Sequence, residues 1–252
     1  MGECGVSREA SIKAARASRP EEHGVKVAIG GAQGRMGRLA FAAIQEEPDL
    51  EFAGGFARTA DQSMGIYDNV EQLLDERKPD VIVDFTPRPV TQGVARAAVE
   101  RGVSPVVGSS EWNAAERAEL ERLCDQHKTG ALIVPNFAMG AILMMSFAEQ
   151  AAKFFPSVEI VEMHRADKRD KPSGTASATA ERIHVGGGRA DVPIHSIRMK
   201  GLLSHQEVLF SNEGELLTIR HDSFSSESFA PGIIAAIRMV KDLKSLQVGL
   251  KL

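Results

Sequence analysis

Two short segments of the sequence carry residue types that could take part in chemistry. The first is the glycine-rich run Gly31–Gly37, which follows an apolar stretch and precedes an amphipathic helical pattern. The second is the charged run His164–Thr175, in which four basic and two acidic residues follow the histidine. A glycine loop at the start of a helix binds phosphates, and a cationic segment binds carboxylates. The two segments together indicate a site for a nucleotide and a small anion.

The glycine loop suits the pyrophosphate of a dinucleotide. Gly31 permits a tight turn, Gly34 lets backbone N–H groups approach the phosphates, and Gly37 allows the helix to lie close to the strand. The spacing is G-x-x-G-x-x-G, and Gln33 stands where the usual pattern has a glycine. A purely structural turn is the alternative, but the alternating strands and helices that follow favour nucleotide binding.

The end of the second expected strand bears on the choice of cofactor. An acidic residue at this place would bind the adenosine ribose hydroxyls and favour NADH. The chain has Ala57 and Arg58 instead, and Arg58 together with Arg35 could bind a 2′-phosphate. Charge therefore favours NADPH over NADH, although a solvated Arg58 would leave both cofactors open.

Two further strand ends carry small or polar residues. The runs Asp84–Thr86 and Gly108–Ser110 follow successive apolar strands, where open α/β sheets bind their ligands. Asp84 could instead cap the next helix, and the serines could be ordinary turn residues.

The charged segment ends in a helix start that could hold a carboxylate. Ser173, Gly174 and Thr175 precede an alanine-rich helical pattern, so backbone N–H groups and a hydroxyl would face an anion. His164 titrates near neutral pH and could serve as an acid or base. A solvated charge run with an ordinary helix cap is the alternative interpretation.

The elements that position these segments form two kinds of pattern. Strands at 25–29, 50–56, 80–85, 104–107 and 131–134 alternate with helices at 35–47, 69–77, 91–101 and 114–127. This alternation predicts a doubly wound parallel sheet of the α/β class. Beyond residue 137, helices at 140–154 and 175–183 and four strands predict an α+β domain with an antiparallel or mixed sheet. A last helix at 229–243 is expected to return to the first domain.

Composition excludes several classes of protein. The 252 residues carry a formal charge of −4 and 5% aromatic residues, so nucleic acid is not an expected partner. The two cysteines, Cys4 and Cys124, predict neither disulfides nor a metal site. No apolar run is long enough to span a membrane, and we expect a cytoplasmic protein. Residues 1–24 are polar and are expected to form a flexible extension.

In these features the chain resembles the 4-hydroxy-tetrahydrodipicolinate reductase (dihydrodipicolinate reductase) family of lysine and diaminopimelate biosynthesis. The resemblance covers Val25 to about Leu243, and its motifs occur in the family's order. The matching motifs are Gly31–Gly37, Asp84–Thr86, Gly108–Ser110, Pro135–Phe137, Glu162–Ala176, Gly201–Phe210, and His221–Ser223 with Ser228–Gly232.

The resemblance implies roles for individual residues. Residues that would bind NADPH or NADH are Gly31, Ala32, Gln33, Gly34, Arg35, Met36, Arg58, Gly108, Ser109, Ser110, Val134, Pro135, Asn136 and Phe137. His164 and Lys168 match the family's proton-transferring pair. Arg165, Gly174 and Thr175 match positions that bind the small dicarboxylate substrate.

The resemblance also implies a domain organisation and an assembly. A Rossmann-like cofactor domain would comprise residues 25–137 and 229–252. Residues 138–228 would bind substrate and build a homotetramer, and a hinge would close one domain on the other.

Three positions depart from the family's usual pattern. Arg165 replaces a second histidine, Glu111 replaces a glycine, and Ser226 replaces an arginine. These departures keep two alternatives open: a reductase of a related cyclic or amino-acid-derived carboxylate, and a non-catalytic protein that binds the nicotinamide nucleotide.

Overall fold

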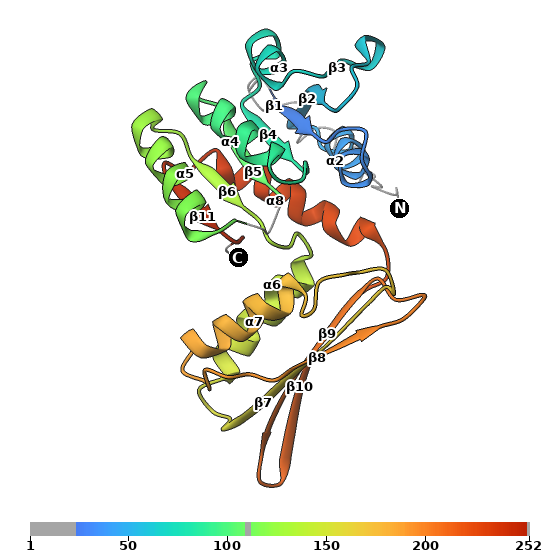
Figure 1. Ribbon diagram of the computed structural model, residues 1–252, viewed down its shortest axis with the longest axis vertical. Coiled ribbons are helices and arrows are strands. Elements are labelled where there is room, and N and C mark those ends of the chain that lie inside the picture. Colours follow the sequence, from blue (N-terminus) through green and yellow to red (C-terminus); the bar gives the residue numbers. More distant parts are fainter. Residues whose placement is uncertain (1–23, 109–111, 251–252) are drawn as a thin grey trace, which may run out of the picture.

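The protein folds around two sheets, one for each half of the expected organisation (Figure 1). The computed structural model describes residues 24–108 and 112–250. The first sheet has seven parallel strands, in the spatial order β11 (Leu246–Val248), β6 (Ala131–Ile133), β5 (Ser104–Val107), β4 (Val81–Asp84), β1 (Val25–Gly30), β2 (Leu50–Phe56) and β3 (Ile66–Tyr67). The predicted Rossmann-like parallel sheet is therefore confirmed.

Helices cover both faces of this sheet, since each crossover between parallel strands must return over one face. One face carries α2 (Arg35–Gln45) and α8 (Ala230–Val240). The other face carries α3 (Val70–Arg77), α4 (Val90–Glu100) and α5 (Ala114–His127). Val27 and Ala28 on β1 are both fully buried, in separate apolar clusters on the two faces.

The second sheet has four strands in the order β10-β9-β7-β8. These strands are β7 (Ser157–His164), β8 (Ile194–Arg198), β9 (Ser204–Asn212) and β10 (Glu215–Ser223). β7 pairs parallel to β8 and antiparallel to β9, so the sheet is mixed, as predicted. The helices α6 (Met139–Ala151) and α7 (Gly174–Val185) pack on one of its faces (Figure 1).

The chain passes between the two sheets twice. It leaves the first sheet after β6 and returns through the 3₁₀ turn η2 (Ser226–Phe229) into α8. α8 packs against α2 and the central strands, and β11 then joins the sheet edge beside β6. The C-terminal helix thus returns to the first sheet. None of the helices in the described part of the chain is both long and apolar enough to cross a lipid bilayer.

Four short elements were not expected from the sequence. β3 and β11 are only two and three residues long, and η1 (Gln62–Met64) and η2 are single 3₁₀ turns. Elements of this length have no measurable hydrophobic period. The position of β11 also depends on its pairing with β6, which is distant in the sequence.

Asp84 has a different role from the helix cap considered above. Its buried carboxylate accepts hydrogen bonds from the backbone N–H and the hydroxyl of Thr86, at 3.1 and 2.9 Å. The residue before α4 is Pro89, and no side chain caps that helix. Asp84 therefore orders the loop that leaves β4 rather than the start of α4.

Candidate active site

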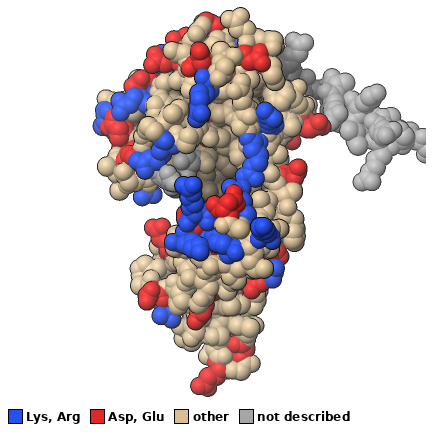
Figure 2. Space-filling view, turned by 45° about the vertical axis from the view of Figure 1, so that its right-hand side comes forward, with Lys and Arg blue, Asp and Glu red and all other residues tan. Residues whose placement is uncertain are grey.

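The first sheet with its helices is called the first domain below, and the second sheet with its helices the second domain. A cavity of about 440 Å³ is lined by residues of both and brings most of the expected residues together. Figure 2 shows the hollow, with Lys and Arg side chains gathered along the edge of the second domain. Residues from the first domain that line the cavity are Arg35, Met36, Phe85, Gly108, Pro135, Asn136, Phe137 and Phe229. Residues from the second domain are His164, Arg165, Asp167, Lys168, Arg169, Asp170, Thr175, Leu203 and Ser204.

The glycine loop lies next to Arg35 and Met36, which line the first-domain side of the cavity. Gly31 has a φ of +72°, a left-handed conformation that glycine adopts without strain. A Cβ at Gly37 would lie 2.3 Å from the Gly31 carbonyl oxygen, so only glycine allows α2 to start this close to β1. The N-cap of α2 is Gly34, and no side chain bonds the first N–H groups of the helix. This bare helix start and close backbone cradle fit a dinucleotide pyrophosphate.

Gly108 lies between two aromatic rings on the same side of the cavity. A Cβ at Gly108 would lie 2.8 Å from Phe85 and 3.0 Å from Phe137. The two rings meet edge to face, with centroids 5.8 Å apart. Only glycine lets these two rings pack so closely on the backbone, and together they form an apolar wall of the cavity.

His164 stands at the end of β7 and is 9% exposed. Its Nδ1 lies 2.5 Å from a carboxylate oxygen of Glu162, and its Nε2 lies 3.2 Å from the Ser204 hydroxyl. Burial lowers the pKa of His164 below its ordinary value, although the neighbouring Glu162 carboxylate acts in the opposite direction. His164 is therefore mainly neutral at pH 7.

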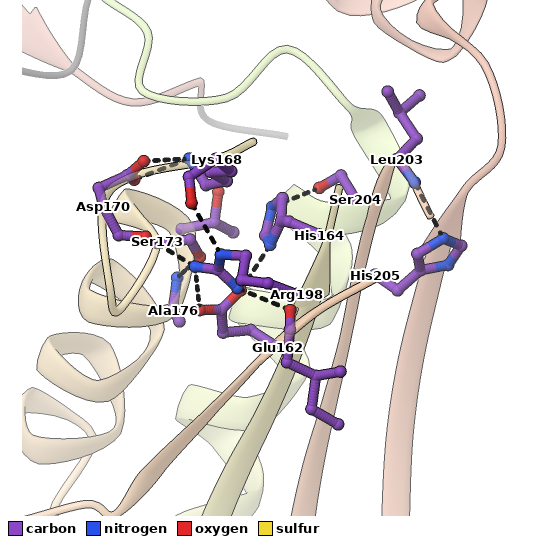
Figure 3. A network of polar contacts seen from close by, with 12 residues as sticks. Glu162, His164, Lys168, Asp170, Ser173, Ala176, Arg198, Leu203, Ser204 and His205 are labelled. Carbon is purple, nitrogen blue, oxygen red and sulfur yellow. Dashed lines mark hydrogen bonds and ion pairs between the residues drawn. The ribbon is translucent and has the colours of Figure 1, made fainter. Parts of the chain in front are cut away.

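Two buried residues that the sequence did not single out hold this histidine (Figure 3). Glu162 is fully buried, and both its oxygens accept hydrogen bonds from Arg198, at 2.8 and 2.9 Å. Burial alone would raise the pKa of Glu162, but hydrogen bonds from Arg198, Ser196 and His164 lower it below its usual value. Glu162 is therefore a charged carboxylate in the interior, paired with an arginine.

The charged loop after β7 carries two ion pairs within itself. The Lys168 ammonium lies 2.7 and 2.8 Å from the two oxygens of Asp170, and Arg165 Nε lies 3.0 Å from Asp167. Burial opposes ionisation of Asp170, but Lys168 lowers the pKa of that carboxyl below its ordinary value. Asp170 thus remains an anion that holds Lys168 at the cavity.

The start of α7 has the geometry expected of a carboxylate site. Ser173 is the N-cap, and its hydroxyl and carbonyl oxygens accept hydrogen bonds from the N–H groups of Ala176 and Ser177. The N–H groups of Gly174 and Thr175 come first in the helix, where no intrahelical partner exists. The Thr175 hydroxyl accepts a hydrogen bond of 2.9 Å from Asn136 of the first domain.

We expect Asn136→Ala to raise the KM for substrate about five- to tenfold and to change kcat less. The substitution removes the hydrogen bond that orients Thr175, which contributes about 1 kcal/mol, and also the bond that Asn136 Oδ1 accepts from the Ala138 N–H before α6. Steady-state kinetics at saturating cofactor measure this effect. The exposed Asn212, replaced in the same way, is the control, and an unchanged KM in Asn136→Ala would contradict this role.

Some expected residues lie elsewhere. Gln33 donates to the Thr59 carbonyl and lines a different cavity together with Ala32. Arg58 is exposed beyond the end of β2, and the Val134 side chain is fully buried. Gly31, Gly34 and Gly174 adjoin the lining residues without belonging to them. Ser109, Ser110 and Glu111, like residues 1–23 of the expected extension, lie outside the described residues.

The sequence contained one overlooked signal for Glu162. Val158, Ile160, Glu162 and His164 alternate along β7 and face the same buried side. A carboxylate on the buried side of a strand needs a partner. Arg198 could not be identified as that partner because the pairing of β7 with β8 joins residues far apart in the sequence.

Family models match almost the whole described chain. The model for the N-terminus of dihydrodipicolinate reductase matches residues 25–137, and the model for its C-terminus matches residues 140–251.

Curated relatives and a solved structure agree with this match. The 4-hydroxy-tetrahydrodipicolinate reductase of Listeria monocytogenes serotype 4b is 39% identical, over 90% of this chain and 98% of that protein. The enzyme of the same name from Moorella thermoacetica is 38% identical, over 90% and 97%. The dipicolinate-bound dihydrodipicolinate reductase from Paenisporosarcina sp. TG-14 has a TM-score of 0.81 at 33% identity, over 90% and 98%. The sequence motifs, the two-sheet fold and these similarities agree: this chain belongs to the dihydrodipicolinate reductase family.

Proposed function

We propose that this protein reduces 4-hydroxy-tetrahydrodipicolinate to tetrahydrodipicolinate with a nicotinamide cofactor, in lysine and diaminopimelate biosynthesis. The observation that carries the proposal is the cavity between the domains. It joins the start of the glycine-loop helix, at Arg35 and Met36, to His164, Lys168 and Thr175. A cofactor on one wall can therefore face an anion on the other.

The substrate side suits a small dicarboxylate. One carboxylate would bind the first N–H groups of α7 at Gly174 and Thr175. Arg165 and Lys168, which line the same cavity, would meet the other negative charge. The related reductase from Paenisporosarcina binds dipicolinate, a planar dicarboxylate, which supports this class of substrate.

The residues present also fit the cofactor. The cradle of Gly31, Gly34 and Gly37 would hold the pyrophosphate, and the nicotinamide ring would lie against the cavity wall near Gly108. When bound, the nicotinamide supplies the hydride. The protein residues orient the two reactants and manage the proton.

Lys168 rather than His164 is the better proton donor in this proposal. Loss of the 4-hydroxyl as water leaves an unsaturated ring, which needs one hydride and one proton. His164 is mainly neutral, with Nδ1 against the Glu162 carboxylate, so its Nε2 is an acceptor. Lys168 is a charged ammonium held at the cavity by Asp170. The lysine therefore gives the proton, and the histidine accepts hydrogen bonds or a proton from the substrate.

We expect Arg58→Ala to raise the KM for NADPH on the order of tenfold and to leave the KM for NADH unchanged. Arg58 is exposed beyond β2, where a cation would meet only the 2′-phosphate of NADPH. Kinetics with each cofactor give the two values, and Arg117→Ala on the exposed side of α5 is the matched control. Equal effects on both cofactors would remove Arg58 from cofactor discrimination.

The second domain is expected to assemble the protein into a homotetramer. Its sheet carries helices on one face (Figure 1). By strand register, the other face carries the apolar Val161, Met163, Ile197 and Leu209 together with the ion pairs Glu159–His195 and Glu207–Arg220. Exposed apolar side chains on an uncovered sheet face favour an interface with another chain. Sedimentation velocity should therefore give four times the mass of one chain, whereas a monomer would contradict the assembly. Residues 25–137 and 229–252 would then move as one body on the tetrameric core of residues 138–228.

The proposed reaction is tested by following NADPH absorbance with substrate generated by the preceding synthase. Substrate-dependent oxidation of the cofactor supports the proposal, and cofactor binding without oxidation contradicts it. A panel of related cyclic carboxylates in the same assay addresses the divergent-reductase alternative, which the family match does not favour. The cytoplasmic location stays a prediction.

A further inference from the structure

A buried polar chain runs beneath the candidate active site and ends on His164. Strand register places Arg198 of β8 and Ser204 of β9 directly opposite His164, one on each side. Arg198 donates hydrogen bonds to both carboxylate oxygens of Glu162. Glu162 in turn contacts His164 Nδ1, and His164 Nε2 contacts the Ser204 hydroxyl. Figure 3 shows this succession of side chains. The histidine is therefore held at both ring nitrogens.

The same arginine also holds the loop that carries Lys168. Arg198 Nε donates to the Lys168 carbonyl at 3.2 Å, and its Nη2 donates to the Asp170 carbonyl at 2.7 Å. The Arg198 side chain is only 7% exposed, and Glu162 is fully buried. One guanidinium thus links the histidine and the lysine of the site through separate hydrogen bonds.

We propose that Glu162 and Arg198 are positioning residues, which hold His164 with its proton on Nδ1 and fix the Lys168 loop against the same strand. The Glu162 carboxylate can only accept hydrogen bonds, so the ring nitrogen that faces it must carry the proton. The unprotonated Nε2 then faces Ser204 and the cavity. This inference rests on the proposed function, because the orientation of His164 matters only if its Nε2 accepts hydrogen bonds or a proton from the substrate.

A purely structural ion pair is the competing explanation. A buried pair costs desolvation of both charges and is weak evidence for stability. Glu162 on β7, Arg198 on β8 and Lys168 in the loop act on the pKa of His164. The other charged or polar groups near it are Arg165, Asp167 and Asp170 in the loop, Arg35 across the cavity and Ser204 on β9. Among these, Glu162 is the carboxylate that directly contacts the ring.

The tautomer can be measured on the unmodified full-length protein. Nitrogen-15 NMR of histidine-labelled protein distinguishes the two neutral forms, and the spectrum of His164→Asn identifies the signal. We expect a protonated Nδ1 and an unprotonated Nε2 at pH 7.5. A proton on Nε2 would overturn the proposal whether or not the protein reduces the proposed substrate.

Glu162→Gln tests the consequence for catalysis. The amide carries no charge, so it no longer favours the protonated ring, and the His164 pKa falls further. We expect kcat to fall about 10- to 100-fold, the acid limb of the kcat/KM profile to move to lower pH, and the affinity for NADPH to stay the same. Glu119→Gln is the control, since Glu119 also accepts bonds from two arginines but lies on α5. A lower melting temperature with an unshifted pH profile would show a structural role only.

If Glu162→Gln does not fold, a second variant tests the same role in catalysis. The double variant Glu162→Met with Arg198→Met replaces the whole buried pair by apolar side chains, which interiors commonly tolerate. We expect it to fold, to bind NADPH and to lose at least about 100-fold in kcat. Wild-type kcat in the folded double variant would contradict the proposal.

Discussion

Replacement of Lys168 by alanine is expected to lower kcat by about 10²- to 10⁴-fold, which is the usual worth of a positioned general acid. The Lys168 ammonium lies at the cavity, held by both oxygens of Asp170. Without it, the proton that accompanies hydride addition would have to come from water. The affinity for NADPH should not change, because the glycine loop belongs to the other domain.

Two further variants separate proton donation from electrostatic attraction. Lys168→Arg keeps the positive charge, but a guanidinium does not give up its proton at neutral pH. We expect it to retain much of the substrate affinity and to remain slow. Lys200→Ala, an exposed lysine beyond β8, should behave like the wild type. Wild-type kcat in Lys168→Ala would remove Lys168 from the mechanism.

Gly37→Ala is expected to weaken NADPH binding at least about 100-fold and to lower the free energy of unfolding by about 1–3 kcal/mol. The new methyl group would lie 2.3 Å from the Gly31 carbonyl oxygen and 2.7 Å from the Ala32 Cα. Both neighbours are backbone atoms, so α2 must move away from the loop. The N–H groups at the helix start would then no longer converge on one phosphate position.

Gly93→Ala is the matched control for this substitution. Gly93 is an exposed helix residue on α4, and a Cβ there would meet nothing within 4 Å. Alanine favours helix by about 1 kcal/mol over glycine, so this variant should be slightly more stable and bind NADPH normally. Calorimetric titration and thermal unfolding measure both effects. Normal NADPH affinity in Gly37→Ala would show that the loop does not bind the pyrophosphate.

Local chemistry explains which parts of the fold were predictable. β2, β5 and α5 begin and end at the expected residues. β5 is a short apolar run, whereas α5 is mostly charged and is delimited by its end signals. Asn113 illustrates such a signal, since it starts α5 by forming a reciprocal capping box with Glu116. β3 and β11 were missed because two or three residues carry no pattern, and β11 pairs with β6, which lies far away in the sequence.

The residues of the candidate site also fall into those that a local motif predicts and those that only the tertiary structure brings together. The glycine loop, His164 and the start of α7 are continuous motifs whose chemistry is visible in the residues themselves. Arg198 and Ser204 meet His164 only because β8 and β9 flank β7 in a particular register. The link from Asn136 to Thr175 likewise joins two domains. Register and domain contact are tertiary facts that no local pattern encodes.

The most direct measurement is the loss of NADPH absorbance with 4-hydroxy-tetrahydrodipicolinate generated by the synthase, repeated with NADH. We predict oxidation that depends on both the substrate and the protein, and a lower KM for NADPH than for NADH. Binding of NADPH without any substrate-dependent oxidation would contradict the proposed function.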